Sequence, residues 1–210
     1  MTSAANWPFA SMAALALLYS YRRCPYAMRA RMALSYAGIA YQVHDISLKD
    51  KTLGLLAVSP KGTVPVLVLP DGRVLEQSLD IMHWALQQHD PAQWLVIDRD
   101  KSKALICEND GAFKQALDKY KYASRFPEQS AASYRSQAEV FVRKLEQALQ
   151  DQLFLSGEHL SLTDVAIFPF IRQFAAVDAN WFAQAAYPKL QAWLQARLES
   201  SLFLGVMARA

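Results

Sequence analysis

The hydrophobic pattern of this chain changes near residue 90, and that change limits the folds that the chain can adopt. Before residue 90, short apolar runs typical of strands alternate with stretches of helical spacing. After Asp90-Pro91 the strand signals stop, and apolar residues recur only at helical spacing. We therefore expect two domains within the 210 residues: an α/β domain over residues 1–89 and an all-helical domain over residues 95–210.

The first domain is expected to contain a small sheet with both parallel and antiparallel strands. The predicted order is strand, helix, strand, short helix, strand, strand and helix, over residues 15–20, 25–37, 41–48, 51–57, 64–69, 73–75 and 78–88. The crossover helix between the first two strands implies that they are parallel. The turn Pro70-Asp71-Gly72 implies an antiparallel hairpin, and Ser78 is expected to cap the last helix.

Apolar stripes at helical spacing predict the helices of the second domain. They run from Leu105 to Tyr120, from Tyr134 to Leu149, from Val165 to Phe174 and from Leu190 to Leu198. The segment Ser161–Asp164 is similar to a capping box, with Asp in place of Glu, at the start of the third of these helices.

Charge and apolar runs argue against several classes of protein. The formal net charge is only +3, without the dense basic face expected of a nucleic-acid binder. No apolar run approaches the ~18 residues that span a membrane. The apolar run Met12–Tyr19 is followed by Arg22 and Arg23, not by a cleavage site, so we interpret it as a buried strand rather than a signal peptide. We therefore expect a cytoplasmic protein with no membrane or nucleic-acid partner.

A cysteine stands where the first strand meets the first helix. Pro25 suits the first turn of a helix, which places Cys24 at or just before the N-cap. Free backbone N–H groups and the helix dipole would stabilise a thiolate there, so we expect a lowered pKa and a reactive sulfur. The nearby arginines should favour ionisation further; they are Arg22, Arg23, Arg29 and Arg31. The alternative is an inert cysteine that only packs, against which the position of Pro25 argues.

The residue two positions after Pro25 decides what chemistry Cys24 can support. A dithiol oxidoreductase would have a second cysteine there, but this chain has Ala27. Cys24 can therefore form a mixed disulfide that an external thiol must resolve. The other cysteine, Cys107, has apolar neighbours and is expected to pack in the core. Two distant cysteines without an export signal predict no disulfide and a reducing compartment.

Two further elements could bind a peptide-like ligand. Pro65 heads a strand after Gly62-Thr63 and is either a cis proline that exposes the backbone of Val64 or an ordinary trans proline. Gln77-Ser78 precedes the helix that begins near Leu79, where free N–H groups could bind a carboxylate or where Ser78 could simply cap the helix.

These three elements, in this order, resemble the glutathione transferase superfamily, and the resemblance covers essentially the whole chain. The segments Tyr19–Arg31 and Ser47–Lys51 are most similar to omega-type and related cysteine-containing bacterial members. Ser59–Leu67 resembles the cis-proline loop of the family, and Asp71–Ile81 resembles the segment that holds the γ-glutamyl end of glutathione. The segment Ser161–Asp164 resembles the structural capping box of the helical domain.

The resemblance implies a thioredoxin-like, glutathione-binding N-terminal domain and a helical-bundle C-terminal domain that lines an electrophile site. It implies that Cys24 faces the glutathione sulfur. It also implies that glutathione is bound by Tyr26, Lys51, Val64, Pro65, Gln77 and Ser78. The chain departs from the omega-type pattern at Gln77, where Glu is usual, and at Thr52, where Pro often follows the lysine.

The expected activity is thiol transfer or a dehydroascorbate-type reduction through a mixed disulfide between Cys24 and glutathione. The alternative is conjugation of glutathione to a small electrophile, which needs a hydroxyl from Tyr19, Ser20 or Tyr21. A third possibility is a non-enzymatic interaction protein on the same fold.

The second substrate would be a small electrophile or a disulfide. Aromatic candidates for lining its site, each of which could instead be core, are Tyr120, Tyr122, Phe126 and Trp181.

Glutathione is expected as a co-substrate, with no cofactor. The histidines His44, His83, His89 and His159 do not form a metal-ligand pattern, so no metal is expected. The resemblance also implies a homodimer.

Overall fold

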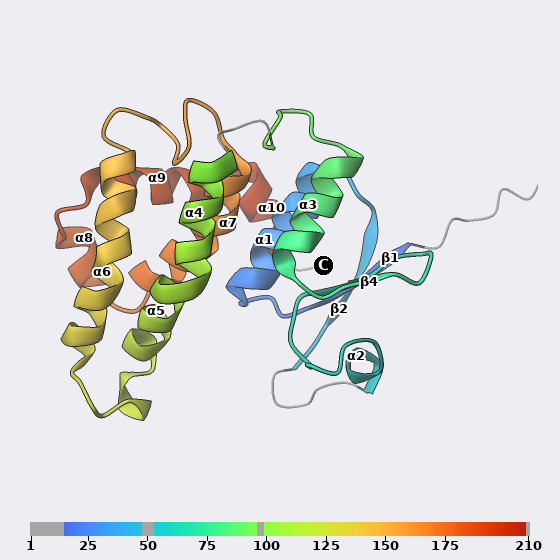
Figure 1. Ribbon diagram of the computed structural model, residues 1–210, viewed down its shortest axis with the longest axis horizontal. Helices are drawn as coiled ribbons and strands as arrows, with labels where there is room; N and C mark the ends of the chain where they lie inside the picture. The colour runs from blue at the N-terminus through green and yellow to red at the C-terminus, as the bar shows by residue number, and fades with distance from the viewer. Residues whose placement is uncertain (1–14, 48–52, 96–98, 209–210) are drawn as a thin grey trace, which may run out of the picture.

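The computed structural model describes residues 15–47, 53–95 and 99–208. Figure 1 shows two parts side by side: a small sheet flanked by helices, and a bundle formed by the remaining helices. This architecture confirms the expected thioredoxin-like domain followed by a helical domain. Within the described ranges, every helix is too short or too polar to span a bilayer.

The sheet has four strands in the order β2-β1-β3-β4. The strands are β1 (Ala16–Ser20), β2 (Tyr41–Asp45), β3 (Val66–Val68) and β4 (Val74–Leu75). As predicted, β1 and β2 are parallel and β3 and β4 form an antiparallel hairpin. β1 is also antiparallel to β3, with Leu18 opposite both Val43 and Leu67.

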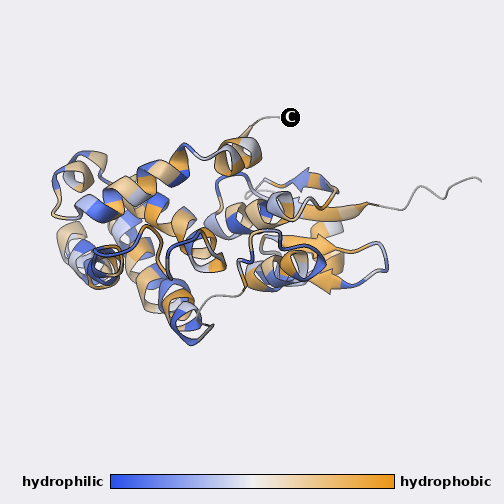
Figure 2. Cartoon of the chain, turned by 90° about the horizontal axis from the view of Figure 1, so that it is seen from above, coloured by the Kyte–Doolittle hydropathy of each residue, from blue (hydrophilic) through white to orange (hydrophobic). Residues whose placement is uncertain are grey.

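Helices cover both faces of this sheet. Alternate residues of a strand point to opposite faces. Accordingly, Leu18 packs in the main core with α1 (Pro25–Tyr36) and α3 (Ser78–Gln88), whereas Tyr19 packs with Leu55 of α2 (Leu53–Val58). Seen from above, the strands are mostly coloured as hydrophobic, and the nearby helices carry both hydrophobic and hydrophilic positions (Figure 2).

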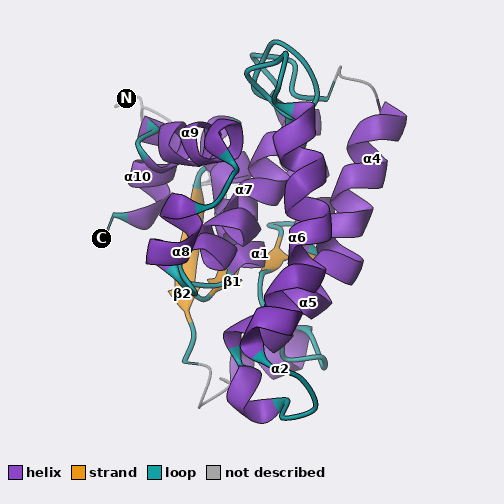
Figure 3. Cartoon of the chain, turned by 90° about the vertical axis from the view of Figure 1, so that its left-hand side faces the viewer, coloured by secondary structure: helices purple, strands orange, loops and turns teal. Residues whose placement is uncertain are grey.

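The second domain contains only helices among its described residues (Figure 3). They are α4 (Arg99–Glu108), a π-helical turn η1 (Asn109–Phe113), α5 (Lys114–Lys121), a 3₁₀ turn η2 (Ala123–Arg125), α6 (Ala131–Ala148), α7 (Leu162–Ala175), α8 (Ala179–Gln184), α9 (Pro188–Leu198) and α10 (Ser201–Met207). The sequence pattern had predicted one helix over Leu105–Tyr120. The structure interrupts it at Gly111, whose φ of −97° and ψ of −105° are not helical.

The central helix α7 begins with the predicted capping box. The fully buried carboxylate of Asp164 accepts hydrogen bonds from the backbone N–H groups of Leu155 and Ser161 and from the indole N–H of Trp193 on α9. One acidic side chain therefore satisfies a backbone N–H group at the start of α7 and fixes the preceding loop and α9 against this helix.

Candidate functional site

Cys24 lies at the N-terminus of α1, as the position of Pro25 predicted. Cys24 is the N-cap residue with extended backbone, Pro25 is the first helical residue, and the Cys24 carbonyl accepts the first helical hydrogen bond from Met28 at 2.9 Å. The side chain is partly buried, and its thiol donates a hydrogen bond to the carbonyl of Val64 at 3.7 Å. The sulfur therefore faces the loop that carries the candidate cis proline.

The peptide bond between Val64 and Pro65 is cis, which confirms the first of the two alternatives for this loop. The loop, the start of α1 and the start of α3 surround a cleft of about 810 Å³. Its lining includes six of the predicted site residues: Cys24, Tyr26, Val64, Pro65, Gln77 and Ser78. Lys51 and Thr52 lie outside the described residues.

The start of α3 differs from the prediction in one respect. Gln77 is the N-cap residue and makes no side-chain capping bond, while Ser78 is the first helical residue rather than the cap. The hydroxyl of Ser78 is buried and accepts hydrogen bonds from Nε and Nη2 of Arg29 at 3.0 and 2.8 Å. Ser78 is therefore held by a buried cation, which the sequence did not indicate.

The net electrostatic effect on Cys24 is opposite to the expected one. Burial raises the pKa of the thiol, and this effect exceeds the lowering by the backbone N–H groups of Ala27 and Tyr26 and by the charges of Lys114 and Arg29. The helix N-terminus acts in the predicted direction, but the prediction of a lowered pKa is wrong for the ligand-free protein.

Arg22 and Arg31 have a structural role instead. Arg22 donates to the carbonyl of Met207 at 2.6 Å, and Arg31 donates to the carbonyl of Arg22 at 2.8 Å. These bonds attach α10 to the loop before Cys24. The cations that lower the thiol pKa are Lys114 of α5 and Arg29.

We expect the alkylation rate of Cys24 to keep rising with pH through about pH 9 in the ligand-free protein. A raised pKa leaves little thiolate at neutral pH, and the thiolate is the species that reacts. The measurement is the rate of iodoacetamide labelling at each pH, read on the Cys24 peptide in a Cys107→Ser variant. A rate that levels off near neutrality would show that the thiol is ionised there, against this account.

Tyr26 lines this cleft and packs against the helical domain. Its ring packs edge-on against Phe170 of α7 and lies 5.0 Å from the guanidinium of Arg29. Burial, aided by the charge of Asp110, raises the pKa of Tyr26 to about 12, so its hydroxyl stays protonated at neutral pH. By contrast, Tyr19 and Ser20 are buried, and neither they nor Tyr21 are part of the described cleft lining.

The aromatic residues proposed for the second substrate lie elsewhere. Tyr120 and Trp181 pack against Phe174 in the helical core, Phe126 packs against Tyr134, and Tyr122 is exposed. None of the four belongs to the described lining of the cleft around Cys24. The sequence shows that these residues are aromatic, but it does not show in which direction each side chain points.

A second cavity, of about 840 Å³, adjoins the cleft between α3 and α4. The two share Leu79, Asp80 and Asp110, so they are neighbours along the start of α3. Cys107 lines this second cavity and is exposed, so the prediction that it packs in the core is wrong. In the described ranges, no cluster of three or more His, Cys, Asp or Glu side chains could hold a metal ion.

Comparisons with known proteins agree with this geometry. The family model described as glutathione S-transferase, N-terminal domain, matches residues 18–93, and the corresponding C-terminal domain model matches residues 128–196. Glutathione S-transferase omega-1 of Sus scrofa is 27% identical over 187 residues, covering 87% of this chain and 76% of that protein. Glutathione S-transferase GstA of Escherichia coli O157:H7 is 25% identical over 171 residues, covering 78% and 84%.

The fold is also that of a crystal structure of a glutathione transferase family member from Pseudomonas fluorescens Pf-5, which has two glutathione molecules bound. The two structures superpose with a TM-score of 0.80 at 20% identity, over 96% of this chain and 95% of the other. At that level of identity the comparison supports the fold alone.

Proposed function

The chain belongs to the glutathione S-transferase superfamily, and on that premise we propose that it is a glutathione-dependent thiol transferase acting through a mixed disulfide between Cys24 and glutathione. The observation that carries the proposal is the position of the Cys24 sulfur, at a helix N-terminus and facing the carbonyl of Val64 across the cleft. Ala27 stands where a second cysteine could have formed a local disulfide. The similarity to omega-type relatives supports this choice of subtype.

Glutathione would bind along the walls of the cleft. The backbone of Val64, before the cis proline, can pair with the cysteinyl residue, and the N-terminus of α3 can hold the γ-glutamyl carboxylate. Lys51 would reach another glutathione carboxylate. Glutathione is bound in the Pseudomonas fluorescens relative of the same fold, and glutathione is the ligand that we propose for this cleft.

The reaction has two exchange steps. The Cys24 thiolate attacks the glutathione sulfur of a glutathionylated disulfide, its S–S bond breaks, and the departing thiolate takes up a proton. A second glutathione thiolate then attacks the glutathione sulfur of the mixed disulfide. Oxidised glutathione is released, and Cys24 leaves as the thiolate. The net reaction converts one mixed disulfide and one glutathione into a free thiol and oxidised glutathione.

The raised pKa of Cys24 affects both steps. Little thiolate is present at neutral pH, but the thiolate of a weaker acid is a stronger nucleophile. The same sulfur is a poor leaving group in the second step. The raised pKa therefore slows the resolution of the mixed disulfide by glutathione.

Conjugation of glutathione to a small electrophile remains the second candidate, because the protonated hydroxyl of Tyr26 lies in the cleft. The electrophile could occupy the adjoining cavity between α3 and α4.

Family resemblance also supports our proposals of a homodimer and a cytoplasmic location, which sedimentation and cell fractionation would test.

The proposed function predicts tight binding of reduced glutathione and faster reduction of a small disulfide than conjugation of a chloro-nitroaromatic electrophile. Calorimetric titration measures the binding of glutathione, and the two activity assays on the same preparation compare the rates of reduction and conjugation. Faster conjugation would favour the second candidate. A titration without binding would favour a non-enzymatic interaction protein.

A further inference from the structure

A third cavity lies within the helical domain and is distinct from the cleft around Cys24. It has a volume of about 620 Å³ and lies between α5, the start of α6 and the segment that joins α7 to α8. Figure 3 shows α5 and α6 side by side. This cavity shares no described lining residue with the cleft or with the cavity that adjoins the cleft. A ligand bound there would therefore leave the proposed glutathione site free.

Tyr120 of α5 brings an unsatisfied hydroxyl to this cavity. The residue is only 5% exposed, and its buried hydroxyl has no hydrogen-bond partner among the described residues. Burial raises the pKa of Tyr120, so the hydroxyl keeps its proton at neutral pH. The charged groups that act on it are Arg135 and Asp178, which line the same cavity, and Glu139. Because an unpaired buried polar group is costly, the hydroxyl indicates a ligand that accepts its proton.

The N-terminus of α6 faces the same cavity. This helix has 18 residues, and its N-cap residue Ser130 accepts a hydrogen bond from the backbone N–H of Ser133 at 3.1 Å. The N–H groups of Ala131 and Ala132, the first two helical residues, have no partner within the helix, and both residues line the cavity. Free N–H groups and the positive end of the helix dipole favour a carboxylate at this position.

Arg135, one turn further along α6, adds a positive charge to the lining. Its guanidinium lies over the ring of Trp181, 4.2 Å from the ring centroid, and its Nε is 3.9 Å from the carboxylate of Glu139. That carboxylate also accepts a hydrogen bond from the hydroxyl of Tyr187 at 2.6 Å. The buried Nε of Arg135 has no hydrogen-bond partner in the described part of the chain. The Tyr120 hydroxyl, the Arg135 guanidinium and the start of α6 are therefore three donors suited to one carboxylate.

Asp178 brings the opposite charge to the cavity. Its carboxylate accepts a hydrogen bond from the backbone N–H of Trp181 at 3.0 Å, which fixes its position and leaves lone pairs for a further donor. Asp178 and the nearby Glu139 would repel a phosphate dianion. A ligand that carries both a carboxylate and an ammonium group finds a partner for each. The apolar side chains of Val177 and Ala179 also line the cavity and suit an aliphatic group.

We propose that this cavity is a binding site for a free α-amino acid with an aliphatic side chain. The carboxylate of the ligand lies at the start of α6, where it accepts from the Tyr120 hydroxyl and the Arg135 guanidinium. The ammonium group of the ligand donates to Asp178. The site goes beyond the proposed function and does not rest on it, because none of these residues lines the glutathione cleft.

The test titrates the full chain, without glutathione, with L-valine and two analogues. The first, 3-methylbutanoate, lacks only the amino group, and the second, 2-methylpropylamine, lacks only the carboxylate. The backbone amide signals of Ala131 and Ala132 are followed by NMR. L-Valine should shift these signals with a dissociation constant at least about fivefold lower than that of either analogue. Equal binding of the three compounds overturns the inference, as does the absence of any shift at the solubility limit of L-valine.

Tyr120→Phe removes the hydroxyl alone. This variant should bind L-valine about fivefold or more weakly, while its melting temperature should be unchanged or higher, because the hydroxyl lacks a partner in the ligand-free protein. The matched control is Tyr122→Phe, which removes the hydroxyl of a more exposed tyrosine outside the described lining and should keep the affinity of the parent protein. Unchanged affinity in Tyr120→Phe overturns the inference.

Asp178→Asn tests the contact with the ammonium group. Asn is also a favourable N-cap residue, so α8 should be retained. The preference for L-valine over 3-methylbutanoate should fall to about twofold or less in this variant. Asp71→Asn makes the same change in an exposed Asp–Arg pair outside the described lining and should keep the full preference. A preference that survives in full in Asp178→Asn overturns the inference.

Discussion

Replacing Cys24 by alanine should lower glutathione-dependent reduction of a small disulfide by about a hundredfold or more, because the substitution removes the atom that forms the covalent intermediate. The substitution removes only a partly buried sulfur and its weak bond to Val64, so the fold should be retained. Conjugation should survive or increase, since no mixed disulfide could then block the cleft. Initial rates of both reactions in the variant and the parent protein measure the effect.

The matched control for that experiment is Cys107→Ser, which alters the exposed cysteine of the neighbouring cavity and should leave the rate of disulfide reduction unchanged. Cys24→Ser is a less decisive variant, because its hydroxyl could itself support conjugation. If Cys24→Ala reduced disulfides as fast as the parent protein, Cys24 could not be the nucleophile.

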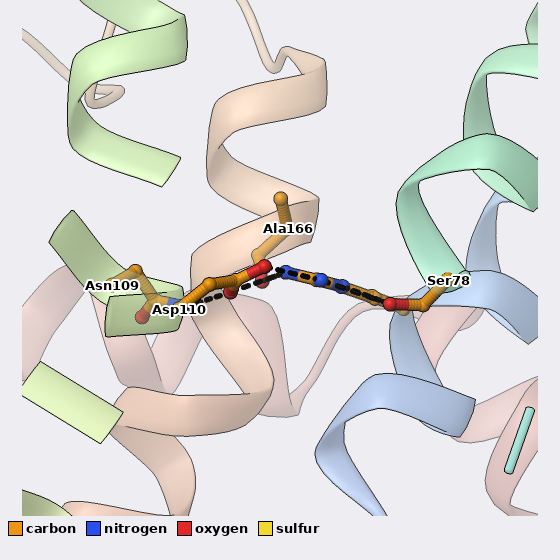
Figure 4. Close-up of polar contacts among 5 residues, drawn as sticks. Ser78, Asn109, Asp110 and Ala166 are labelled. Carbon is orange, nitrogen blue, oxygen red and sulfur yellow. Dashed lines mark hydrogen bonds and ion pairs between the residues drawn. The ribbon is translucent and has the colours of Figure 1, made fainter. Parts of the chain in front are cut away.

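Arg29→Met should lower the free energy of unfolding by about 2–3 kcal/mol. The substitution removes a buried cation, and with it the donors to the hydroxyl of Ser78 and two of the donors to the carboxylate of Asp110 in the helical domain (Figure 4). The partial exposure of Asp110 places the cost near the lower end of the range for broken buried ion pairs. Urea denaturation of the variant and the parent protein measures the change.

The control for Arg29→Met is Arg73→Met, which removes an Arg–Asp pair in the exposed β3–β4 turn. In that pair the side chains of Arg73 and Asp71 are 66% and 53% exposed. Exposed pairs contribute little, so the change should be under about 0.5 kcal/mol. Equal effects from the two variants would mean that the buried network does not join the domains as described.

The proline positions made much of the site predictable from sequence. Pro25 begins α1, and that alone places Cys24 at the N-cap. The cis geometry of Pro65 was one of two alternatives from spacing, and only the family resemblance favoured it. The predicted strand directions rested on a crossover helix and a tight turn, which are local signals.

The incorrect predictions concern properties that depend on tertiary packing. The pKa of Cys24 depends on burial, which the residues around it in the sequence do not set. Cys107 follows the buried Ile106, but adjacent residues of a helix point about 100° apart, so apolar neighbours do not place a residue in the core.

The Arg29–Asp110 pair was also missed. A charged residue on the buried side of α1, among Met28 and Ala30, is a signal that a buried partner exists, because isolated charges are rarely buried. The partner lies 81 residues away in the other domain, within a π-helical turn, so no local pattern could have identified Asp110.

The most direct measurement of the proposed chemistry is the intact mass of the protein after incubation with oxidised glutathione, in a Cys107→Ser background and with Cys24→Ala as the blank. The account predicts the addition of one glutathionyl group, located at Cys24 by peptide mapping, removed by excess reduced glutathione and absent from the blank. A protein whose mass stays unchanged at every pH at which it remains folded would contradict the mixed-disulfide mechanism.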